Sequence, residues 1–429
     1  MSSVSLAEQR LRDVDWSGLP GVLAPVIHAV ADVLSGTRAE RALDVLLRAN
    51  RTWDADQRRA AAECVFGVGL WRRRLAYQAG LLDVPPKSEA AEVLLFTFLR
   101  DLAALPEQTD AFAFPSRPRE PPSEWPIAES MPDFLAAHFR AELGDVEARQ
   151  FVQALNHPGP VCLRANTQLL SRLELLRALE GEGVPCVATR HAPHGIRLQT
   201  RANIYGLSAK FPGAFEVQDE GSQLIVELTD ARPGHCVLDF CAGAGGKTLG
   251  LANATGVTGQ VLANDIDDKK LERLRHRATR ANVTTLRICP GKVPEQVLAD
   301  RVLVDAPCSE LGALRRGPDL RFQLTPADLR RWPALQLELL LRASRHVKPG
   351  GWLIYATCTL NHAENEAVVE SFLRQASEFQ ILSPQPPWLT PDMRRGNFFL
   401  SLPHRHDMDG FFVALFVASA DHPLPATSF

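Results

Sequence analysis

The feature that most constrains the fold is a repeated pattern, from residue 218 onward, of short apolar segments that each end in a polar or glycine-rich loop. Buried parallel strands joined by helices produce this pattern. Four such segments are CVLDFCAGAGG, QVLANDID, RVLVDAPC and WLIYATC. Residues 218–429 are therefore predicted to form an α/β domain with a doubly wound parallel sheet. Ligands of such sheets bind at the carboxyl ends of the strands, so the loops after these segments hold the candidate site.

Three regions precede this domain. Residues 1–110 place apolar side chains at three- and four-residue spacings, as in RAERALDVLLRAN, and are predicted to be helical. Residues 111–126 are rich in Pro, Ser, Arg and Glu, which is typical of an extended linker, and we expect a domain boundary there. Residues 127–217 are predicted to form a small unit of helices and short strands.

Composition excludes several classes of protein. The chain lacks an uncharged apolar run of the roughly 18 residues that a membrane helix needs, and its first residues lack the apolar centre of a signal peptide. We therefore expect a cytoplasmic protein without a membrane segment. The eight cysteines include no CxxC pair, so we expect reduced thiols and no metal site. A net charge of −3 confines any nucleic-acid contact to a local patch.

The first candidate feature is the glycine-rich loop after the first apolar segment. Gly243, Gly245 and Gly246 separate that segment from a predicted helix that begins near Lys247. Glycines let the backbone approach a ligand, and a helix amino terminus offers free amides, which suits a nucleotide-like cofactor. A phosphate-binding GxxxxGK[ST] loop is disfavoured, because the place of its first Gly is not occupied by glycine. The alternative is a tight turn that binds nothing.

The second apolar segment ends at Asp265, about twenty residues further on, where an acidic side chain meets a cofactor ribose in related folds. The alternative role for Asp265 is a cap for the helix that follows. Asp267 or Asp268 fits that cap better, so Asp265 is the candidate for ribose binding.

Two cysteines follow the third and fourth apolar segments, Cys308 in DAPCS and Cys358 in ATCT. Each alone is most simply a small buried residue, since free cysteines are often buried. Together, at neighbouring strand ends, they suggest chemistry. A thiolate that adds to carbon 6 of a pyrimidine makes carbon 5 electron-rich enough to attack an electrophilic methyl group. A second group must then help to remove the carbon 5 proton so that the thiol can leave.

These motifs resemble those of the NOL/NOP/Sun family of RNA cytosine-5 methyltransferases, especially its bacterial members that act on 16S ribosomal RNA. The resemblance covers most of the chain and rests on VQDEGSQL, CAGAGGK, NDID, DAPCSELGALRRGPDLRF, YATCTLNHAENEAVV and DGFFVALF. The segments RALDVLL and CVFGVGLWRRRL are similar to the NusB-like RNA-binding domain of those enzymes. The resemblance implies a Rossmann-like class I methyltransferase domain that uses S-adenosylmethionine, preceded by an all-α NusB-like domain and a small α/β RNA-binding segment.

The resemblance also implies a role for each matching residue. Cys358 would be the nucleophile, Cys308 would help to release the product, and Asp305 would contact cofactor and cytosine. Asp265 would bind the cofactor ribose. The methionine part of the cofactor would be surrounded by Cys241, Ala242, Gly243, Ala244, Gly245, Gly246 and Lys247, with Lys247 near the reacting base.

Two positions depart from the family pattern. The family usually has CAAPGGK, and Gly243-Ala244 replaces Ala-Pro here, so the rigidity that Pro gives is lost. The family also tends to have an Asp near the adenine, about 25 residues after the ribose acid, where this chain has Pro290. We expect the first change to lower the affinity for the cofactor without loss of function, and the second to alter recognition of the adenine.

The segment LRRGPDLRF follows the DAPCS motif and contains Arg315, Arg316, Arg321 and Phe322. Arginines bind phosphates and an aromatic ring can stack on a base, so we expect this segment to contact RNA. The alternative is an ordinary solvated loop.

Three other functions compete with methylation of ribosomal RNA: a tRNA target, DNA cytosine methylation with Cys308 as nucleophile, and a non-catalytic RNA-binding assembly factor. The thiol of Cys358 and the N-terminal region disfavour the second, and the presence of both thiols disfavours the third. We expect a monomer that binds single-stranded RNA or a flipped cytosine. We also expect an isolated fragment of residues from about 215 to 429 to bind the cofactor but to methylate RNA poorly, because RNA recognition is assigned to the preceding segments.

Overall fold

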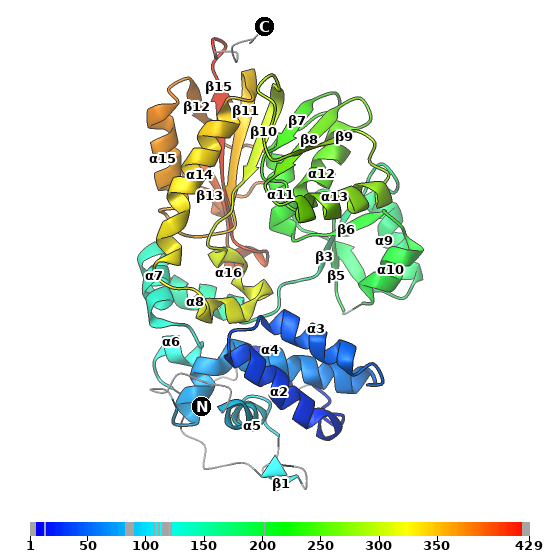
Figure 1. Cartoon of the computed structure of the whole chain (residues 1–429), viewed down its shortest axis with the longest axis vertical. Helices are drawn as coiled ribbons and strands as arrows, with labels where there is room; N and C mark the ends of the chain where they lie inside the picture. The colour runs from blue at the N-terminus through cyan, green and yellow to red at the C-terminus, as the bar shows by residue number, and fades with distance from the viewer. Residues whose placement is uncertain are drawn as a thin grey trace. The chain divides into compact units, whose positions relative to one another are not determined.

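The computed structural model describes residues 6–12, 14–81, 90–105, 108–109, 112–113, 120, 122–200 and 202–422. The chain divides into two units, Met1–Pro158 with Ala313–Pro326 and Gly159–Gly312 with Ala327–Phe429. This division falls after Pro158. Much of the Pro-rich stretch 111–126, where we expect a boundary, lies outside the described residues. Figure 1 shows the elements of each unit.

The first unit is mainly helical, as its apolar spacing predicts. Its helices are α1 (Leu6–Arg12), η1 (Pro20–Val22), α2 (Leu23–Leu34), α3 (Ala39–Ala49), α4 (Ala55–Gln78), α5 (Ala91–Asp101), α6 (Trp125–Ala128), α7 (Asp133–Leu143), α8 (Asp145–Leu155) and η4 (Pro318–Phe322), with a short pair β1 (Gln108–Thr109) and β2 (Phe112–Ala113). Helix α4 begins with a capping box, in which Asp54 Oδ1 accepts from the Gln57 amide at 2.8 Å and Gln57 Oε1 accepts from the Asp54 amide at 3.1 Å. Buried aliphatic side chains of α2, α4 and α5 form one core.

Helices α6 to α8 pack within this unit, because α4 binds the chain between α6 and α7. The Arg73 amide donates to Ser130 Oγ at 3.0 Å, and the Arg73 guanidinium donates to Asp133 Oδ1 at 2.7 Å. The sequence pattern predicts residues 127–158 to belong with the short strands that follow them. In the structure they group with the helical unit, because the contacts of Arg73 connect them to α4.

The second unit begins with a small antiparallel sheet of order β4-β5-β3-β6. Its elements are β3 (Cys162–Ala165), α9 (Arg172–Gly181), β4 (Cys186–Ala188), β5 (Gly195–Leu198), α10 (Ile204–Lys210) and β6 (Phe215–Val217). Its core includes Leu163, Leu175 and Ile196, which come from two strands and α9. This sheet provides the short strands that the sequence predicts between residues 127 and 217.

A larger sheet follows, with nine strands among the described residues, in the order β13-β14-β15-β11-β10-β7-β8-β9 and with β12 paired to β15. The four apolar segments form β7 (Cys236–Asp239), β8 (Gln260–Asp265), β10 (Ala299–Asp305) and β11 (Val347–Thr357), and β9 (Leu286–Pro290) completes the parallel part. The prediction of a parallel sheet is wrong at one edge. There β15 (Phe411–Ala418) pairs antiparallel with β11, and β12 (Phe379–Leu382), β13 (Arg394–Arg395) and β14 (Phe398–Ser401) extend that edge.

Helices cover both faces of the larger sheet (Figure 1). Alternate strand residues point to opposite faces, so Val237 and Val261 pack with α11 (Glu220–Leu228) and α12 (Gly246–Thr255) on one face. Leu238 and Leu262 pack on the other face with α14 (Asp328–Ser344) and α15 (Glu366–Gln375). The remaining elements are α13 (Asp268–Arg280), η3 (Leu311–Arg316), η5 (Pro391–Met393) and α16 (Pro403–His406).

None of the helices in the described part of the chain combines the length and the apolar character that a bilayer-spanning segment needs.

Candidate active site

The glycine-rich loop joins β7 to α12, as predicted, and requires glycine at two positions. Gly243 has a φ of +55° and Gly245 a φ of +86°, a region that glycine enters without strain. A Cβ atom on Gly245 would also collide with the Leu274 side chain of α13. The tight turn therefore depends on both backbone freedom and close packing.

Asp265, at the end of β8, holds this loop. Its Oδ2 accepts a hydrogen bond from the Gly243 amide at 2.8 Å. The helix cap is instead Asp267, whose Oδ1 accepts from the amides of Lys269 at 2.9 Å and Lys270 at 3.3 Å. The structure thus assigns the cap to Asp267 and leaves Asp265 beside the glycine loop. Pro290 lies opposite Asp265 in the β8–β9 pairing and is exposed.

The two predicted thiols lie together at the ends of neighbouring parallel strands. Cys308 Sγ and Cys358 Sγ are 3.4 Å apart, and all eight cysteines of the chain are free. Cys308 is 6% exposed, whereas Cys358 is partly exposed. The hydrogen bond with Cys308, followed by burial and nearby negative charge, raises the pKa of the Cys358 thiol well above its ordinary value. Cys358 is therefore a neutral thiol in this state of the protein.

Lys247 and Asp305 form an ion pair near Cys358, with Nζ 2.5 Å from Oδ2. Burial lowers the pKa of Lys247, but the charge of Asp305 and the hydrogen bond to it outweigh burial, so the pKa is raised. Lys247 Nζ also lies 5.6 Å from the centre of the Phe411 ring at the start of β15. The structure therefore brings the Cys358 loop, the glycine loop and the end of β10 into one site.

Sequence reasoning missed a buried carboxylate that joins the two cysteine loops. Glu364 accepts hydrogen bonds from the Ser309 amide at 3.0 Å, Ser309 Oγ at 2.5 Å, Gln336 Nε2 at 2.9 Å and Asn361 Nδ2 at 2.9 Å. Its side chain is fully buried. The signal for it was the acidic residue in NHAEN, six residues after Cys358. Glu364 fixes the loop of Cys308 against the loop of Cys358.

A second missed residue is Asp239, the last residue of β7. Its Oδ2 accepts from Thr248 Oγ1 at 2.7 Å, and its Oδ1 has no hydrogen-bond partner among the described residues. Burial raises the pKa of Asp239 to about 7, helped by the charges of Asp305 and Asp265 and opposed by the hydrogen bond from Thr248. An acidic residue inside the apolar run VLDF was the available signal.

Burial bears on the RNA contacts expected of LRRGPDLRF, residues 314–322. Arg321 is fully buried in the helical unit, where its Nη1 donates to Asn156 Oδ1 at 2.8 Å. Arg315 is buried as well, and the Arg72 guanidinium lies 4.7 Å from the centre of the Phe322 ring. Arg321 is thus unavailable to a phosphate as the protein stands. Arg316 is exposed.

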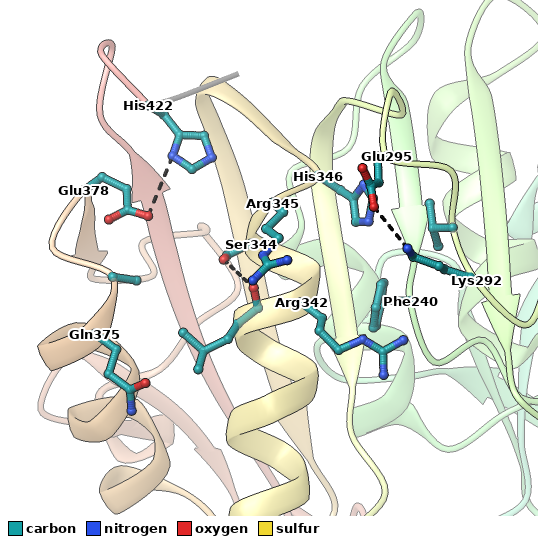
Figure 2. A pocket seen from close by; sticks show the side chains of 13 residues that line it. Phe240, Lys292, Glu295, Arg342, Ser344, Arg345, His346, Gln375, Glu378 and His422 are labelled. Atoms are coloured by element: carbon teal, nitrogen blue, oxygen red, sulfur yellow. Dashed lines mark hydrogen bonds and ion pairs between the residues drawn. The ribbon is translucent and has the colours of Figure 1, made fainter. Parts of the chain in front are cut away.

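A cavity of about 670 Å³ lies in another part of the second unit, near the ends of α14 and α15 (Figure 2). Its lining includes Phe240, Arg342, Arg345, His346 and His422. None of the predicted catalytic or cofactor residues lines it. The candidate site is therefore defined by the strand ends and not by this cavity.

Comparisons with known proteins agree with the fold. Residues 226–417 match the family model described as 16S rRNA methyltransferase RsmB/F. Residues 131–205 match the ferredoxin-like domain of RsmF/B-like methyltransferases, and this match begins just before α7. The solved structure of PH0851, 24% identical, superposes with a TM-score of 0.76 over 92% of this chain and 98% of that one. This likeness supports the α/β Rossmann-like methyltransferase fold.

Two curated relatives show the same family at the level of sequence. The "Probable ribosomal RNA small subunit methyltransferase B" of Synechocystis is 36% identical over an aligned length of 300, and the match covers 66% of each chain. Ribosomal RNA small subunit methyltransferase B of Vibrio cholerae is 32% identical over 272 residues, 62% of this chain and 61% of the relative. The match thus spans a little under two thirds of the length of these relatives. Taken with the matches over residues 131–205 and 226–417, it places these two stretches of the chain in the RsmB/F methyltransferase family.

Proposed function

We propose that this protein transfers a methyl group from S-adenosylmethionine to carbon 5 of a cytosine in RNA, with 16S ribosomal RNA as its target. The observation that carries the proposal is the pair of thiols, Cys308 and Cys358, 3.4 Å apart at neighbouring strand ends. A single buried thiol would need no function, but two thiols near a largely buried Lys247–Asp305 ion pair are the kind of cluster that active sites contain. The names of the curated relatives support the ribosomal target.

The residues at the strand ends fit S-adenosylmethionine. The glycine loop from Cys241 to Lys247 gives the backbone freedom that close approach to the methionine part needs. Asp265 presents a carboxylate for the ribose, and the neighbouring Ile266, 88% exposed, offers an apolar surface for the adenine. This surface would stand in for the carboxylate acceptor that Pro290 lacks. When bound, the cofactor supplies an electrophilic methyl group.

The chain's own residues supply the rest of the reaction. Cys358 passes its proton to a base as its sulfur bonds to carbon 6, and the electrons of the C5–C6 double bond move to carbon 5, which takes the methyl group. A base then removes the carbon 5 proton, the C5–C6 double bond re-forms, and the carbon–sulfur bond breaks, so that Cys358 leaves with the bonding electrons and takes up a proton again. Cys308 lies close enough to Cys358 to assist this last step. The charged side chains of Lys247 and Asp305, which hold each other in place, would contact the cofactor and the base.

RNA recognition is assigned to the parts outside the methyltransferase sheet. We propose that the helical unit is NusB-like and that it and the small sheet bind RNA, which presents a single-stranded or flipped cytosine. Exposed Arg316 remains a candidate phosphate contact. We further propose that the enzyme is a cytoplasmic monomer.

The test is methylation of purified RNA by the full-length protein with labelled cofactor, followed by bisulfite mapping. We expect label at a cytosine of 16S ribosomal RNA and none with the Cys358→Ala variant. Label in tRNA alone would keep the chemistry and overturn the target. A Cys358→Ala variant as active as the unmodified protein would overturn the mechanism.

A further inference from the structure

Two arginines from outside the glycine loop bind its backbone carbonyl groups. Arg277 Nη1 donates to Ala244 O at 2.6 Å, and Arg164 Nη1 donates to Gly246 O at 2.6 Å. These carbonyls lie on either side of Gly245, at the turn into α12. Together with the Asp265 bond to the Gly243 amide, they anchor the loop at three points from three different elements.

Arg277 is itself held in place by a buried carboxylate. Glu216 Oε2 accepts from Arg277 Nε at 3.1 Å and from Arg277 Nη2 at 2.7 Å. Its other oxygen, Oε1, accepts from Arg280 Nη2 at 2.9 Å. The Glu216 side chain is only 7% exposed, so these charged hydrogen bonds are little weakened by solvent. A planar guanidinium with two edges can bind the carboxylate and still reach the carbonyl.

The small sheet supplies the fixed end of this arrangement. Glu216 lies on β6 and pairs in register with Arg164 on β3. Burial lowers the pKa of Arg164 to about 10, so the guanidinium stays charged at neutral pH. The small sheet thus supports both arginines that bind the glycine loop. Arg164 lies on its strand β3, and Arg277 is held by Glu216 on its strand β6.

The residue at position 244 explains why such bonds matter. Ala244 stands where the resembling family has Pro, so the loop lacks a residue that fixes its own backbone torsion. The hydrogen bond from the Arg277 guanidinium to the Ala244 carbonyl restricts the backbone conformation at this position instead, through a contact from another part of the chain. Its loss would let the loop sample conformations that do not accept a ligand, which lowers apparent affinity.

We propose that Arg277 is a positioning residue for the cofactor: held by Glu216, it keeps the Ala244 carbonyl, and with it the loop 241–247, in the conformation that accepts S-adenosylmethionine. The identity of the ligand rests on the proposed function, whereas the anchoring of the loop does not. Arg277 therefore acts on cofactor affinity through the backbone, and the proposal gives it no role in RNA binding.

Arg280 provides a matched control. It also pairs with Glu216 and also lies on α13, but its hydrogen bond goes to Glu216 and not to the loop. Replacing either arginine by Gln removes one positive charge beside the same carboxylate. Both side chains are partly exposed, 25% for Arg277 and 43% for Arg280, so both variants should fold.

The experiment is calorimetric titration of S-adenosylmethionine into the full-length protein and the two variants, without RNA. We expect Arg277→Gln to bind about tenfold more weakly and Arg280→Gln to stay within about twofold of the unmodified protein. Thermal unfolding without cofactor should give similar midpoints for both variants. In turnover assays the KM for cofactor should rise in Arg277→Gln while the KM for RNA stays unchanged.

Two results would overturn the inference while leaving the proposed function intact: equal affinities for all three proteins, or equal losses in both variants. The second would mean that the charge balance around Glu216 matters and not the bond to Ala244. Failure of the unmodified protein to bind S-adenosylmethionine at all would overturn the proposed function itself.

Discussion

At the scale of single residues, the proposed role of Cys358 as nucleophile depends on the protonation state of its thiol. Its hydrogen bond with Cys308 and its burial raise the pKa of Cys358. A neutral thiol is a poor nucleophile, so the attacking thiolate must form when substrate binds. We therefore expect turnover to rise with pH over the neutral and alkaline range, as the thiolate fraction grows. Initial rates at saturating cofactor across that range measure this, and a rate that does not change with pH would contradict it.

Substitution of each thiol should give a different defect. Cys358→Ala should remove nearly all turnover, because no neighbouring group replaces a positioned nucleophile. Cys308→Ala should still bond to RNA through Cys358 but release it slowly, so a covalent complex should accumulate. A denaturing gel of each variant with RNA and cofactor separates these outcomes. If a covalent complex accumulated with Cys358→Ala and not with Cys308→Ala, Cys308 would be the nucleophile, as in DNA cytosine methylation.

Asp239 should make stability depend on pH. Its pKa in the folded protein is about 7, above the ordinary value of 3.8, so the folded state keeps a proton that the unfolded chain releases. Stability from this group is therefore highest in acid and falls as the pH rises towards 7. Asp239→Asn removes the titration and keeps an acceptor for Thr248.

Urea unfolding of both proteins at about pH 5 and about pH 7.5 measures this effect. The variant should gain roughly 2–3 kcal/mol relative to the unmodified protein between the two conditions. A difference that does not change with pH would show that Asp239 is ionised at both.

The sequence pattern singles out candidate residues that follow strands, but not residues whose partners are distant in the chain. Cys308, Cys358 and Asp265 stand at strand ends or in loops, where polar side chains are conspicuous. Asp239 and Glu364 are buried acids whose roles depend on tertiary packing, and no local pattern reports such partners. The same is true of Arg277, because a basic side chain on an amphipathic helix is normally solvated.

At the scale of elements, the loops after β10 and β11 behave as one unit because Glu364 joins them. Glu364→Gln should destabilise the protein by about 2–3 kcal/mol, since one carboxylate oxygen becomes an amide donor that faces groups which themselves donate. Turnover should fall as well, because the two thiols would no longer be held in a fixed position relative to one another. Chemical unfolding and single-turnover assays test both expectations.

A matched control for this variant lies on α14. The Glu338 side chain is 61% exposed and pairs with Arg342 on the same helix, so Glu338→Gln makes the same chemical change at the surface. It should alter neither stability nor turnover appreciably. Equal effects of the two substitutions would show that Glu364 does not hold the thiol loops together.

The element scale also shows where patterns of periodicity succeed. Apolar runs correctly predicted β7, β8, β10 and β11, because strands buried on both faces leave a continuous apolar signature. The antiparallel β15 was missed as a strand of the sheet, since strand direction depends on the length and path of its connections. The segment 314–322 was expected to contact RNA because arginines bind phosphates and Phe322 can stack on a base, whereas tertiary packing buries Arg321.

At the scale of the whole molecule, the small sheet changes what a fragment can do. We expected residues from about 215 to 429 to bind the cofactor alone, but that fragment lacks Arg164 and the strand β3 that pairs with Glu216. It should bind S-adenosylmethionine more weakly than residues 159–429, which keep both. Calorimetry on the two fragments makes the comparison. Both lack the N-terminal stretch of the helical unit, so equal affinities would show that the small sheet has no part in cofactor binding.

The path of the chain through residues 313–326 has a consequence for inheritance and engineering. The helical unit is built from two separate stretches, and the second of them lies in sequence between the two thiols of the other unit. Arg321, in that second stretch, is buried against Asn156 of the first. A recombination event that replaced only the N-terminal stretch by one without an acceptor at position 156 would leave the buried guanidinium without its partner. The helical unit should therefore be exchanged between enzymes only with both of its stretches, and these two stretches should change together among related enzymes.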